Sequence, residues 1–316
     1  MNSISQIKPR PLRSGDTIGV VAPASQGDPE LAAAGIRWLE EQGFRVQPGL
    51  STNQSLGYLS GPDAVRAADI NAMFAAPDID GIVCLRGGYG TMRLLELLDY
   101  EIIRTHPKVF VGYSDITALH VSIGQRTGLV TFHGPMVASD MGKDMPAYTW
   151  DYFSRAVTGS EPLGPVINPP LAPPPEWIVP GAAQGYLTGG NLSLIVATLG
   201  TPYEIDTCGK ILFLEEVGEA PYRIDRMLTQ LLLAGKLQAA AGIVFDVCAD
   251  CAIEAKPPSF SVAEVLQDRL GGLQKPVLCN LFFGHTADKA TLPLGVMATL
   301  DTGAGGLVII ETATSA

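Results

Sequence analysis

The segment Val109-Phe110-Val111-Gly112-Tyr113-Ser114-Asp115-Ile116-Thr117-Ala118-Leu119 joins an apolar run to a helical pattern without a spacer. A buried strand that turns directly into a helix is the unit from which parallel α/β sheets are built. Such a turn would expose the Ser114 hydroxyl beside the backbone amides of the helix start, which could hold an oxyanion. Ser114 could equally cap the helix, because serine and aspartate are preferred there, and the α/β-hydrolase pattern G-x-S-x-G fails at Ile116. This segment alone leaves both interpretations open.

The same alternation of strand and helix runs through the first half of the chain. Apolar runs predict strands over residues 17–23, 45–47, 81–85, 108–112 and 129–132, and helical patterns lie at 29–42, 63–74, 91–98 and 116–125. The runs are continuously apolar, as in a parallel sheet that helices cover on both faces. We therefore expect a Rossmann-like or flavodoxin-like α/β domain, with its site beyond the carboxyl ends of the strands.

A proline-rich stretch separates this half from the rest. Eight of the 24 prolines lie between residues 161 and 180, and proline suits neither a helix interior nor a central strand. We expect an N-terminal α/β domain over 1–160, a linker over 161–181 and a C-terminal domain over 182–316. The last part has a glycine-rich segment at 185–190 and predicted strands at 210–215, 242–247, 277–281, 296–300 and 306–311. These favour a β-rich, barrel-like α/β domain.

The composition and charge of the chain argue against several classes of protein. Of the 316 residues, 47% are hydrophobic and 17% charged, which suits a large core. The net charge of −11, with no basic block, argues against a nucleic-acid-binding protein. No apolar stretch reaches the roughly 18 residues of a membrane span, and the polar start predicts no secretory signal. Five cysteines, an odd number, fit a reduced compartment, so we expect a cytoplasmic protein without membrane or nucleic-acid partners.

A second strand-to-helix turn reads Arg86-Gly87-Gly88-Tyr89-Gly90. Glycines at such a turn let backbone amides approach a ligand closely, although they can also serve a tight turn alone. The sequence matches neither the dinucleotide-binding motif G-x-G-x-x-G nor the Walker motif, so it gives little support for nucleotide binding. Arg86 could bind a carboxylate as a bidentate pair or form a structural ion pair.

Two acidic residues and a histidine in the second half are further candidates. Glu215 and Glu216 end an apolar strand, where a carboxylate can orient a histidine or remain a rim charge. His285 follows the apolar run 281–283 and could be a base or a structural donor. Cys248 and Cys251 form a single C-x-x-C without a second pair, and the histidines lack metal-ligand spacing. We expect no metal and no cofactor.

Together these segments form an ordered series that resembles the LD-carboxypeptidases, a family of serine peptidases that includes the microcin-immunity peptidases. The resemblance runs from about residue 17 to the end, without a departure at the reactive positions. It rests on seven motifs: Arg86-Gly-Gly-Tyr-Gly90, Gly112-Tyr-Ser-Asp115, His133-Gly-Pro135, Gly189-Gly-Asn191, Leu212-Phe-Leu-Glu-Glu216, Pro221-Tyr-Arg-Ile-Asp-Arg226 and Gly284-His285.

The resemblance implies a site between an N-terminal α/β domain and a C-terminal β-rich domain, usually in a homodimer. Carried over by position, Ser114 is the nucleophile, His285 the general base and Glu215 the carboxylate that orients it. Backbone amides would hold the oxyanion, with Asp115 one source and the Gly87–Gly88 turn the other. We expect Arg86 to bind the substrate carboxylate.

Family members remove the terminal D-alanine from the murein tetrapeptide by cutting an L-to-D bond, in peptidoglycan recycling. The resemblance thus implies a serine carboxypeptidase that works through an acyl-enzyme on a murein-derived peptide. Two alternatives remain at this point. One is a microcin-immunity type amidase of the same family. The other is a non-catalytic ligand-binding protein, in which Ser114 is only a helix cap.

Overall fold

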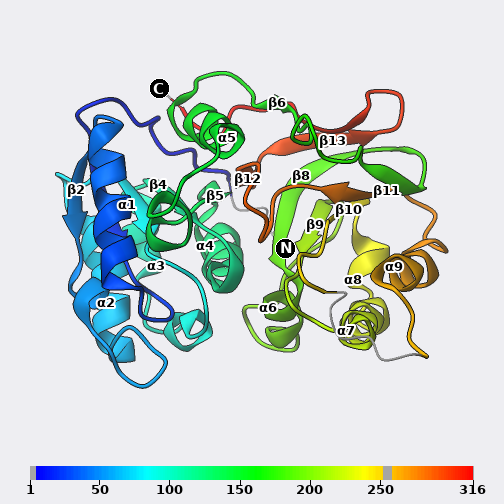
Figure 1. Cartoon of the computed structure of the whole chain (residues 1–316), viewed down its shortest axis with the longest axis horizontal. Helices are drawn as coiled ribbons and strands as arrows, with labels where there is room; N and C mark the ends of the chain where they lie inside the picture. Colours follow the sequence, from blue (N-terminus) through cyan, green and yellow to red (C-terminus); the bar gives the residue numbers. More distant parts are fainter. Residues whose placement is uncertain (1–4, 252–257, 316) are drawn as a thin grey trace.

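The computed structural model describes residues 5–251 and 258–315, which form two β-sheets side by side (Figure 1). The first sheet has six strands and the second has eight. Helices pack against both, and one hydrophobic core cluster contains residues of both sheets, among them Phe132 of the first and Val244 of the second.

The first sheet confirms the prediction of a parallel α/β fold. Its strands are β1 (Thr17–Val21), β2 (Arg45–Pro48), β3 (Gly81–Cys84), β4 (Val109–Gly112) and β5 (Thr131–His133). They are parallel and lie in the order β2-β1-β3-β4-β5, the flavodoxin-like order. Their carboxyl ends therefore meet at one edge, where β4 leads into Ser114.

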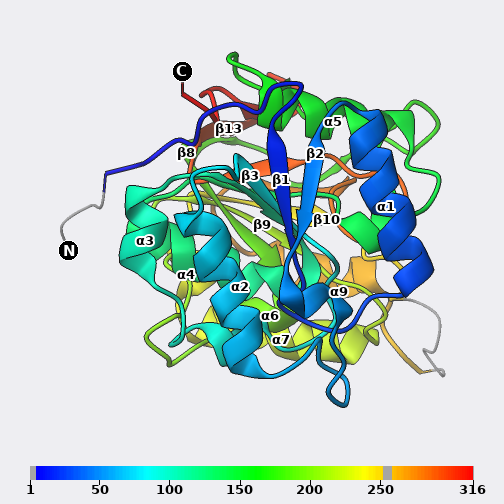
Figure 2. The ribbon, with the colours of Figure 1, turned by 90° about the vertical axis from the view of Figure 1, so that its left-hand side faces the viewer.

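Helices cover both faces of this sheet (Figure 2). Side chains alternate along each strand, so Val20 and Val83 face one core cluster and Val21 and Ile82 face the other. The first cluster includes α1 (Pro29–Glu41) and α5 (Ala147–Thr158), and the second includes α2 (Asp63–Ala75), α3 (Tyr100–Thr105) and α4 (Thr117–Thr127). Short turns η1 (Leu50–Asn53), η2 (Thr91–Leu94) and η3 (Ser114–Ile116) and a π-turn, η4 (Val137–Met141), lie between them.

One predicted helix is wrong in extent. The sequence indicated a helix over 91–98, but only the 3₁₀ turn η2 forms there, and α3 begins separately at Tyr100. The reason is a cap: the Asp99 side chain accepts hydrogen bonds from the amides of Glu101 and Ile102, which starts a new helix.

The second sheet is mixed. Its strands are β6 (Gly164–Pro165), β14 (Gly306–Ile309), β13 (Met297–Asp301), β8 (Ala182–Asn191), β9 (Ile211–Glu215), β10 (Gly242–Asp246), β11 (Val277–Leu281) and β7 (Glu176–Val179), in that spatial order. The middle four, β8 to β11, are parallel, and the outer strands are antiparallel to them or to each other. Over the described ranges β6 and β7 are the two ends, so this sheet is open and does not close into a barrel.

Four helices cover one face of the parallel strands: α6 (Leu192–Ala197), α7 (Pro221–Leu233), α8 (Lys236–Ala239) and α9 (Val262–Leu270). The glycine-rich segment 185–190 proves to be part of β8, the longest strand in the described chain. The proline-rich segment holds β6 and β7 at the sheet edges, where a strand can do without one ladder of amide donors.

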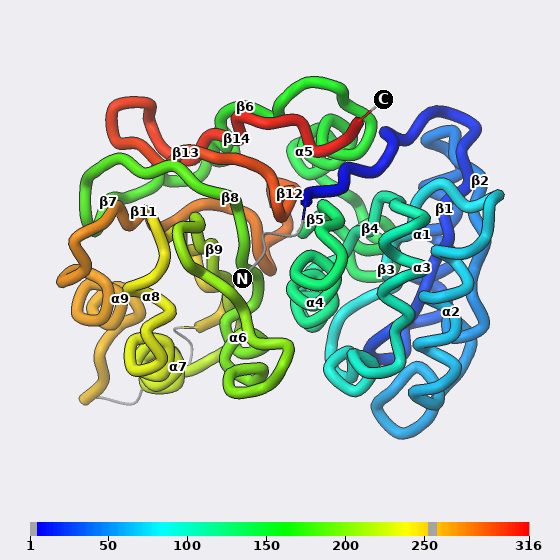
Figure 3. The backbone as a smooth tube through the Cα atoms, turned by 180° about the vertical axis from the view of Figure 1, so that it is seen from behind, coloured from blue at the N-terminus to red at the C-terminus, as the bar shows by residue number. Residues whose placement is uncertain are grey.

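A short strand connects the chain of the second sheet to the first sheet. The strand β12 (Leu292–Leu294), which the sequence did not reveal, pairs antiparallel with β5 of the first sheet (Figure 3). Its chain has just left β11 of the second sheet, so the segment 282–291 runs from one sheet to the other. His285 lies on this crossing segment, which positions it between the sheets.

Candidate active site

Ser114 sits in a strained turn at the carboxyl end of β4. Its φ is +65°, in the left-handed region that residues other than glycine rarely adopt. Its side chain makes no cap hydrogen bond: the N-cap of η3 is Tyr113 and that of α4 is Ile116. The Ser114 hydroxyl instead lies 3.1 Å from Nε2 of His285. The helix-capping interpretation therefore does not describe this serine.

His285 also contacts the end of β9. Its Nδ1 lies 2.7 Å from Oε2 of Glu215, whose side chain is fully buried. A carboxylate only accepts, so Nδ1 carries the proton and Nε2 is left to accept from Ser114. Burial alone would lower the pKa of His285, but the hydrogen bond and the charge of Glu215 outweigh it and raise this pKa. The three side chains form a continuous Ser–His–Glu chain that spans both sheets.

The second acid, Glu216, points elsewhere. Its Oε2 accepts from the hydroxyl and the amide of Ser193 at 2.6 and 2.9 Å, and its Oε1 accepts from the Asn191 side chain at 3.1 Å. These contacts hold the start of α6 against β9. Successive residues of a strand face opposite sides of the sheet, which is why Glu215 and Glu216 separate.

The Gly87–Gly88 turn lies directly against Ser114. A Cβ on Gly87 would be 2.8 Å from Cβ of Ser114 and 3.4 Å from the amide nitrogen of Asp115. Gly88 has a φ of +112°, which only glycine adopts readily. No hydrogen-bond acceptor within the described residues contacts the amides of Gly87 and Gly88. The turn and the Asp115 amide therefore form a cradle in which an oxyanion could be bound.

The Asp115 side chain fastens this cradle. Its Oδ2 accepts from the amide of Thr91 at 2.9 Å, and the Thr91 hydroxyl donates to the Asp115 carbonyl at 2.6 Å. Burial raises the pKa of Asp115, and the bonds from Thr91 oppose that shift. The fully buried Arg66 holds the Gly90 carbonyl at 3.0 Å from the other side. The side chain of Asp115 thus positions the turn, and its amide remains for a ligand.

Arg86 lies at the start of the same turn. Its Nη1 donates to the carbonyl of Gln26 at 3.3 Å. Its Nε is buried and has no partner among the residues that the structure describes. Arg86 therefore has a donor that no described residue uses, and it directly precedes Gly87, which lies against Ser114.

Several buried groups around the triad were not found from the sequence. The rings of Tyr113 and His285 lie 5.0 Å apart, edge to face. Lys289 forms a buried ion pair with Asp140 in η4 and lies 4.9 Å from the Tyr113 ring centre. These contacts join residues far apart in sequence, and no local motif announces them.

His133 supports the crossing segment from β5. It is fully buried, and its Nε2 donates to the carbonyl of Phe283 at 2.9 Å. Burial lowers the pKa of His133 to about 4, so it stays neutral near pH 7. It fixes the chain two residues before His285.

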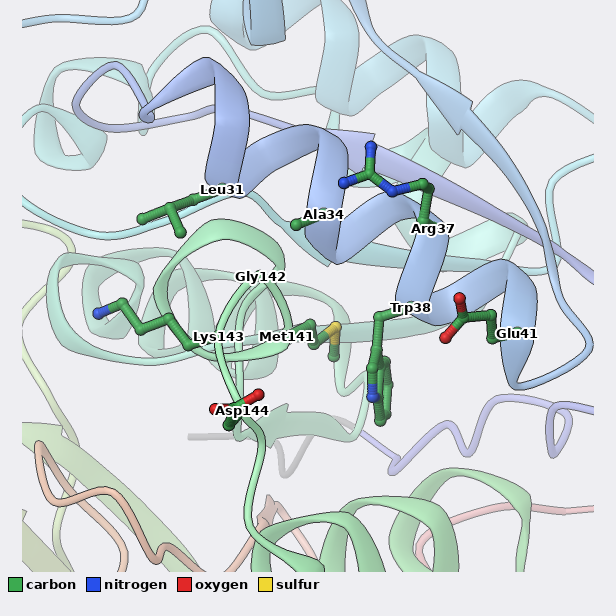
Figure 4. Close-up of a pocket in the computed structure, with 9 residues that line it drawn as sticks. All are labelled: Leu31, Ala34, Arg37, Trp38, Glu41, Met141, Gly142, Lys143 and Asp144. Carbon is green, nitrogen blue, oxygen red and sulfur yellow. The ribbon is translucent and has the colours of Figure 1, made fainter.

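The described residues offer few other candidate functional sites. In residues 5–251 and 258–315 no group of three or more His, Cys, Asp or Glu side chains could hold a metal ion. No helix in those ranges is long and apolar enough to span a membrane. A hollow of about 540 Å³ lies between α1 and residues 141–144 and is lined by Leu31, Trp38 and Lys143, among others (Figure 4). The triad residues do not line it.

Two family models match the chain. The LD-carboxypeptidase N-terminal domain matches residues 18–134. The LD-carboxypeptidase C-terminal domain matches residues 184–300. Ser114 falls in the first and both Glu215 and His285 in the second.

Individual relatives align over nearly the whole chain. A probable murein peptide carboxypeptidase of Bacillus subtilis (strain 168) is 42% identical over 314 residues, 98% of this chain and 95% of that protein. The apo structure of the microcin C7 self-immunity protein MccF superposes with a TM-score of 0.88 at 29% identity, covering 98% of this chain and 100% of that one. The muramoyltetrapeptide carboxypeptidase of Oxalobacter formigenes gives a TM-score of 0.83 at 31% identity, with 93% and 99% covered.

Proposed function

Because the chain belongs to the LD-carboxypeptidase family and is a peptidase, we propose that it removes the terminal D-alanine from murein tetrapeptide. The bond cut joins an L-centre to the D-alanine. Ser114, His285 and Glu215 carry the reaction in this proposal. The observation that supports it best is the geometry at Ser114, a serine in a left-handed turn 3.1 Å from a histidine that Glu215 orients.

The proposed reaction has two halves. Ser114 Oγ attacks the scissile carbonyl carbon while its proton passes to Nε2 of His285. Glu215 stabilises the imidazolium, and the amides of Gly87, Gly88 and Asp115 face the oxyanion. The intermediate collapses to an acyl-enzyme, and His285 returns the proton to the departing amino group of D-alanine. Water then attacks the ester with His285 as base, and the proton returned to Ser114 Oγ releases the shortened peptide.

The substrate class is supported by the relatives. The Bacillus subtilis protein is called a murein peptide carboxypeptidase and the Oxalobacter protein a muramoyltetrapeptide carboxypeptidase. A carboxypeptidase must bind a free terminal carboxylate. We assign that role to Arg86, whose planar fork suits bidentate binding and which precedes the oxyanion turn.

A second candidate is a microcin-immunity type activity on a peptidyl-nucleotide. The TM-score of 0.88 with the MccF structure favours keeping it. Both candidates use the same triad and differ in the group that leaves. The substrate therefore separates them, and the mechanism does not.

We also propose the wider arrangement that the family resemblance implies. The domains are 1–160 and 182–316 with a linker at 161–181, and the two family models leave residues 135–183 unmatched, which supports that division. We propose a homodimer in the cytoplasm. Five cysteines, none of them in a disulfide in the described chain, support a reduced compartment.

One assay tests the proposal. Purified enzyme is incubated with murein tetrapeptide and, separately, with an aminoacyl-sulfamoyl adenosine, and the products are identified by mass spectrometry. We expect tripeptide and D-alanine from the first substrate, and neither product with Ser114→Ala. Cleavage of the sulfamoyl compound alone would favour the second candidate. No cleavage of either substrate by a folded enzyme would contradict both.

A further inference from the structure

A second buried carboxyl group lies beside the triad and has no part in the proposed reaction. Asp246 ends β10, is 1% exposed, and follows Phe245, which pairs with Leu214 of β9. By the same register Asp246 and Glu215 end neighbouring parallel strands. Phe245 and Leu214 face the α6–α9 core, so the two acids face the opposite side, toward His285.

Gly284 shows how close the two acids are to the crossing segment. A Cβ on Gly284 would clash with Oδ2 of Asp246 and would lie 2.9 Å from Oε2 of Glu215. Oδ1 of Asp246 accepts from the amide of Phe283 at 3.3 Å. Oδ2 of Asp246 and Oε1 of Glu215 are both buried, and neither has a hydrogen-bond partner among the described residues. Each acid thus leaves one oxygen unsatisfied in the same small region.

Ionising both acids at the same time is energetically unfavourable, because too little positive charge surrounds them. The titratable groups around them are Glu216 just after β9, Cys248 after β10, Tyr113 after β4, His133 on β5, and His285 and Lys289 on the crossing segment. Lys289 is already paired with Asp140, and His133 is neutral. Among these groups in the described part of the chain, His285 is the one that can supply a further positive charge, and it supplies only one. Burying a second carboxylate without a cation is strongly unfavourable.

We propose that Asp246 is a positioning residue of the active site, which keeps its proton while Glu215 is ionised. Its neutral carboxyl supports the Phe283–His285 segment and leaves a single negative charge beside the imidazole. Burial, followed by the charge of Glu215, raises the pKa of Asp246 to about 7 against the opposing effect of backbone amide hydrogen bonds, which is consistent with a protonated carboxyl below that pH. This inference rests on the proposed role of Glu215 as the carboxylate that orients His285.

Infrared spectroscopy tests the proton without any turnover. At pH 6 we expect a protonated-carboxyl band in the wild type that is missing in Asp246→Asn and unchanged in Asp268→Asn, a matched change at an exposed aspartate. In Glu215→Gln the band should titrate about one pH unit lower, because the neighbouring negative charge is gone. No Asp246 band at pH 6, or a band that Glu215→Gln does not move, would overturn the proposal. Both results are independent of whether murein tetrapeptide is the substrate.

Kinetics provide the second measurement. Asp246→Asn keeps a neutral group of the same shape, so we expect kcat within about threefold of wild type, whereas Asp246→Ala should lower kcat about tenfold or more. Melting temperatures show that each variant is folded. Equal losses in folded Asp246→Asn and Asp246→Ala would contradict a role for a neutral carboxyl. If Asp246→Ala does not fold, the infrared comparison still decides. If no substrate is turned over, the proposed function fails and the infrared result stands alone.

Discussion

At the scale of single residues, the neighbouring elements hold Ser114 in a strained backbone conformation. A left-handed φ costs a non-glycine residue of order 1 kcal/mol or more. The strand β4 and the turn η3 hold it there, and the hydroxyl meets His285 as a result. The strained φ and the absence of a cap hydrogen bond indicate that Ser114 does not stabilise this turn. We therefore expect its role to be chemical.

This predicts that Ser114 substitutions abolish activity with little effect on stability. Ser114→Ala should lower kcat by several orders of magnitude and change the melting temperature by no more than about 4 °C, since no cap hydrogen bond is lost. Ser114→Gly should be equally inactive but melt higher than Ser114→Ala, because glycine adopts positive φ without strain. Calorimetry and turnover are measured on the same preparations. A folded Ser114→Ala enzyme that releases D-alanine at the wild-type rate would disprove the nucleophile assignment.

A second prediction concerns the pH dependence that His285 imposes. Glu215 raises the pKa of His285 against the opposing effect of burial, and only the neutral imidazole can accept the Ser114 proton. The ratio kcat/KM should therefore rise with pH as His285 loses its proton. In Glu215→Gln the charge is removed while burial remains, so the pKa of His285 should fall. An NMR titration of the imidazole in both proteins measures the shift directly, and an unchanged or higher pKa in Glu215→Gln would contradict this account.

At the scale of elements, the site is built from three strand ends and the turns that follow them. The Gly87–Gly88 turn follows β3, Ser114 follows β4, and Glu215 ends β9 of the other sheet. The contacts between Asp115 and Thr91 lock the first two turns together. The close approach of Gly87 to Ser114 leaves no space for a side chain.

Gly87→Ala should therefore damage catalysis through the turn alone. The added methyl would lie 2.8 Å from Cβ of Ser114, and the displaced turn should lower kcat about a hundredfold, the usual effect of losing one oxyanion donor. Gly272→Ala is a matched control, because nothing lies within 4 Å of its Cβ position. We expect wild-type kcat in the control. Equal kcat in both variants would remove the turn from the proposed oxyanion site.

At the scale of the whole molecule, the proposed active site depends on the contact between the two sheets. The crossing segment carries His285, and β12 anchors it to β5 of the first sheet. His133 and the Lys289–Asp140 pair add buried contacts across the same boundary. Ser114 and His285 come into contact only when both sheets are present.

A fragment of residues 1–160 should consequently carry Ser114 and hydrolyse nothing. It would also expose the β5 edge that β12 covers and the core around Phe132, so we expect it to self-associate in size-exclusion chromatography. Full-length Ser114→Ala, inactive but with a normal elution volume, is the control. Turnover by the fragment would mean that the base lies within residues 1–160, with His133 the first residue to examine.

The sequence was sufficient to predict the five parallel strands of the first sheet and the residues of the candidate triad. The continuously apolar runs predicted β1, β3 and β4, because a strand buried on both faces needs no polar alternation. The ordered motifs around residues 86, 114, 215 and 285 led to the family. Each of these signals lies within a few consecutive residues, so it can be recognised without the folded structure.

The direction of each side chain and its long-range contacts become visible only in the folded structure. The sequence could not show that the glycines of 185–190 belong to a strand, since glycine disfavours strands unless other backbone packs closely, as Phe213 does against Gly189. Nor could it show β12, the Lys289–Asp140 pair or the unsatisfied oxygen of Asp246 beside Glu215. Each depends on contacts between residues more than 30 positions apart or on a strand register, and sequence periodicity carries information only about neighbours along one helix or strand.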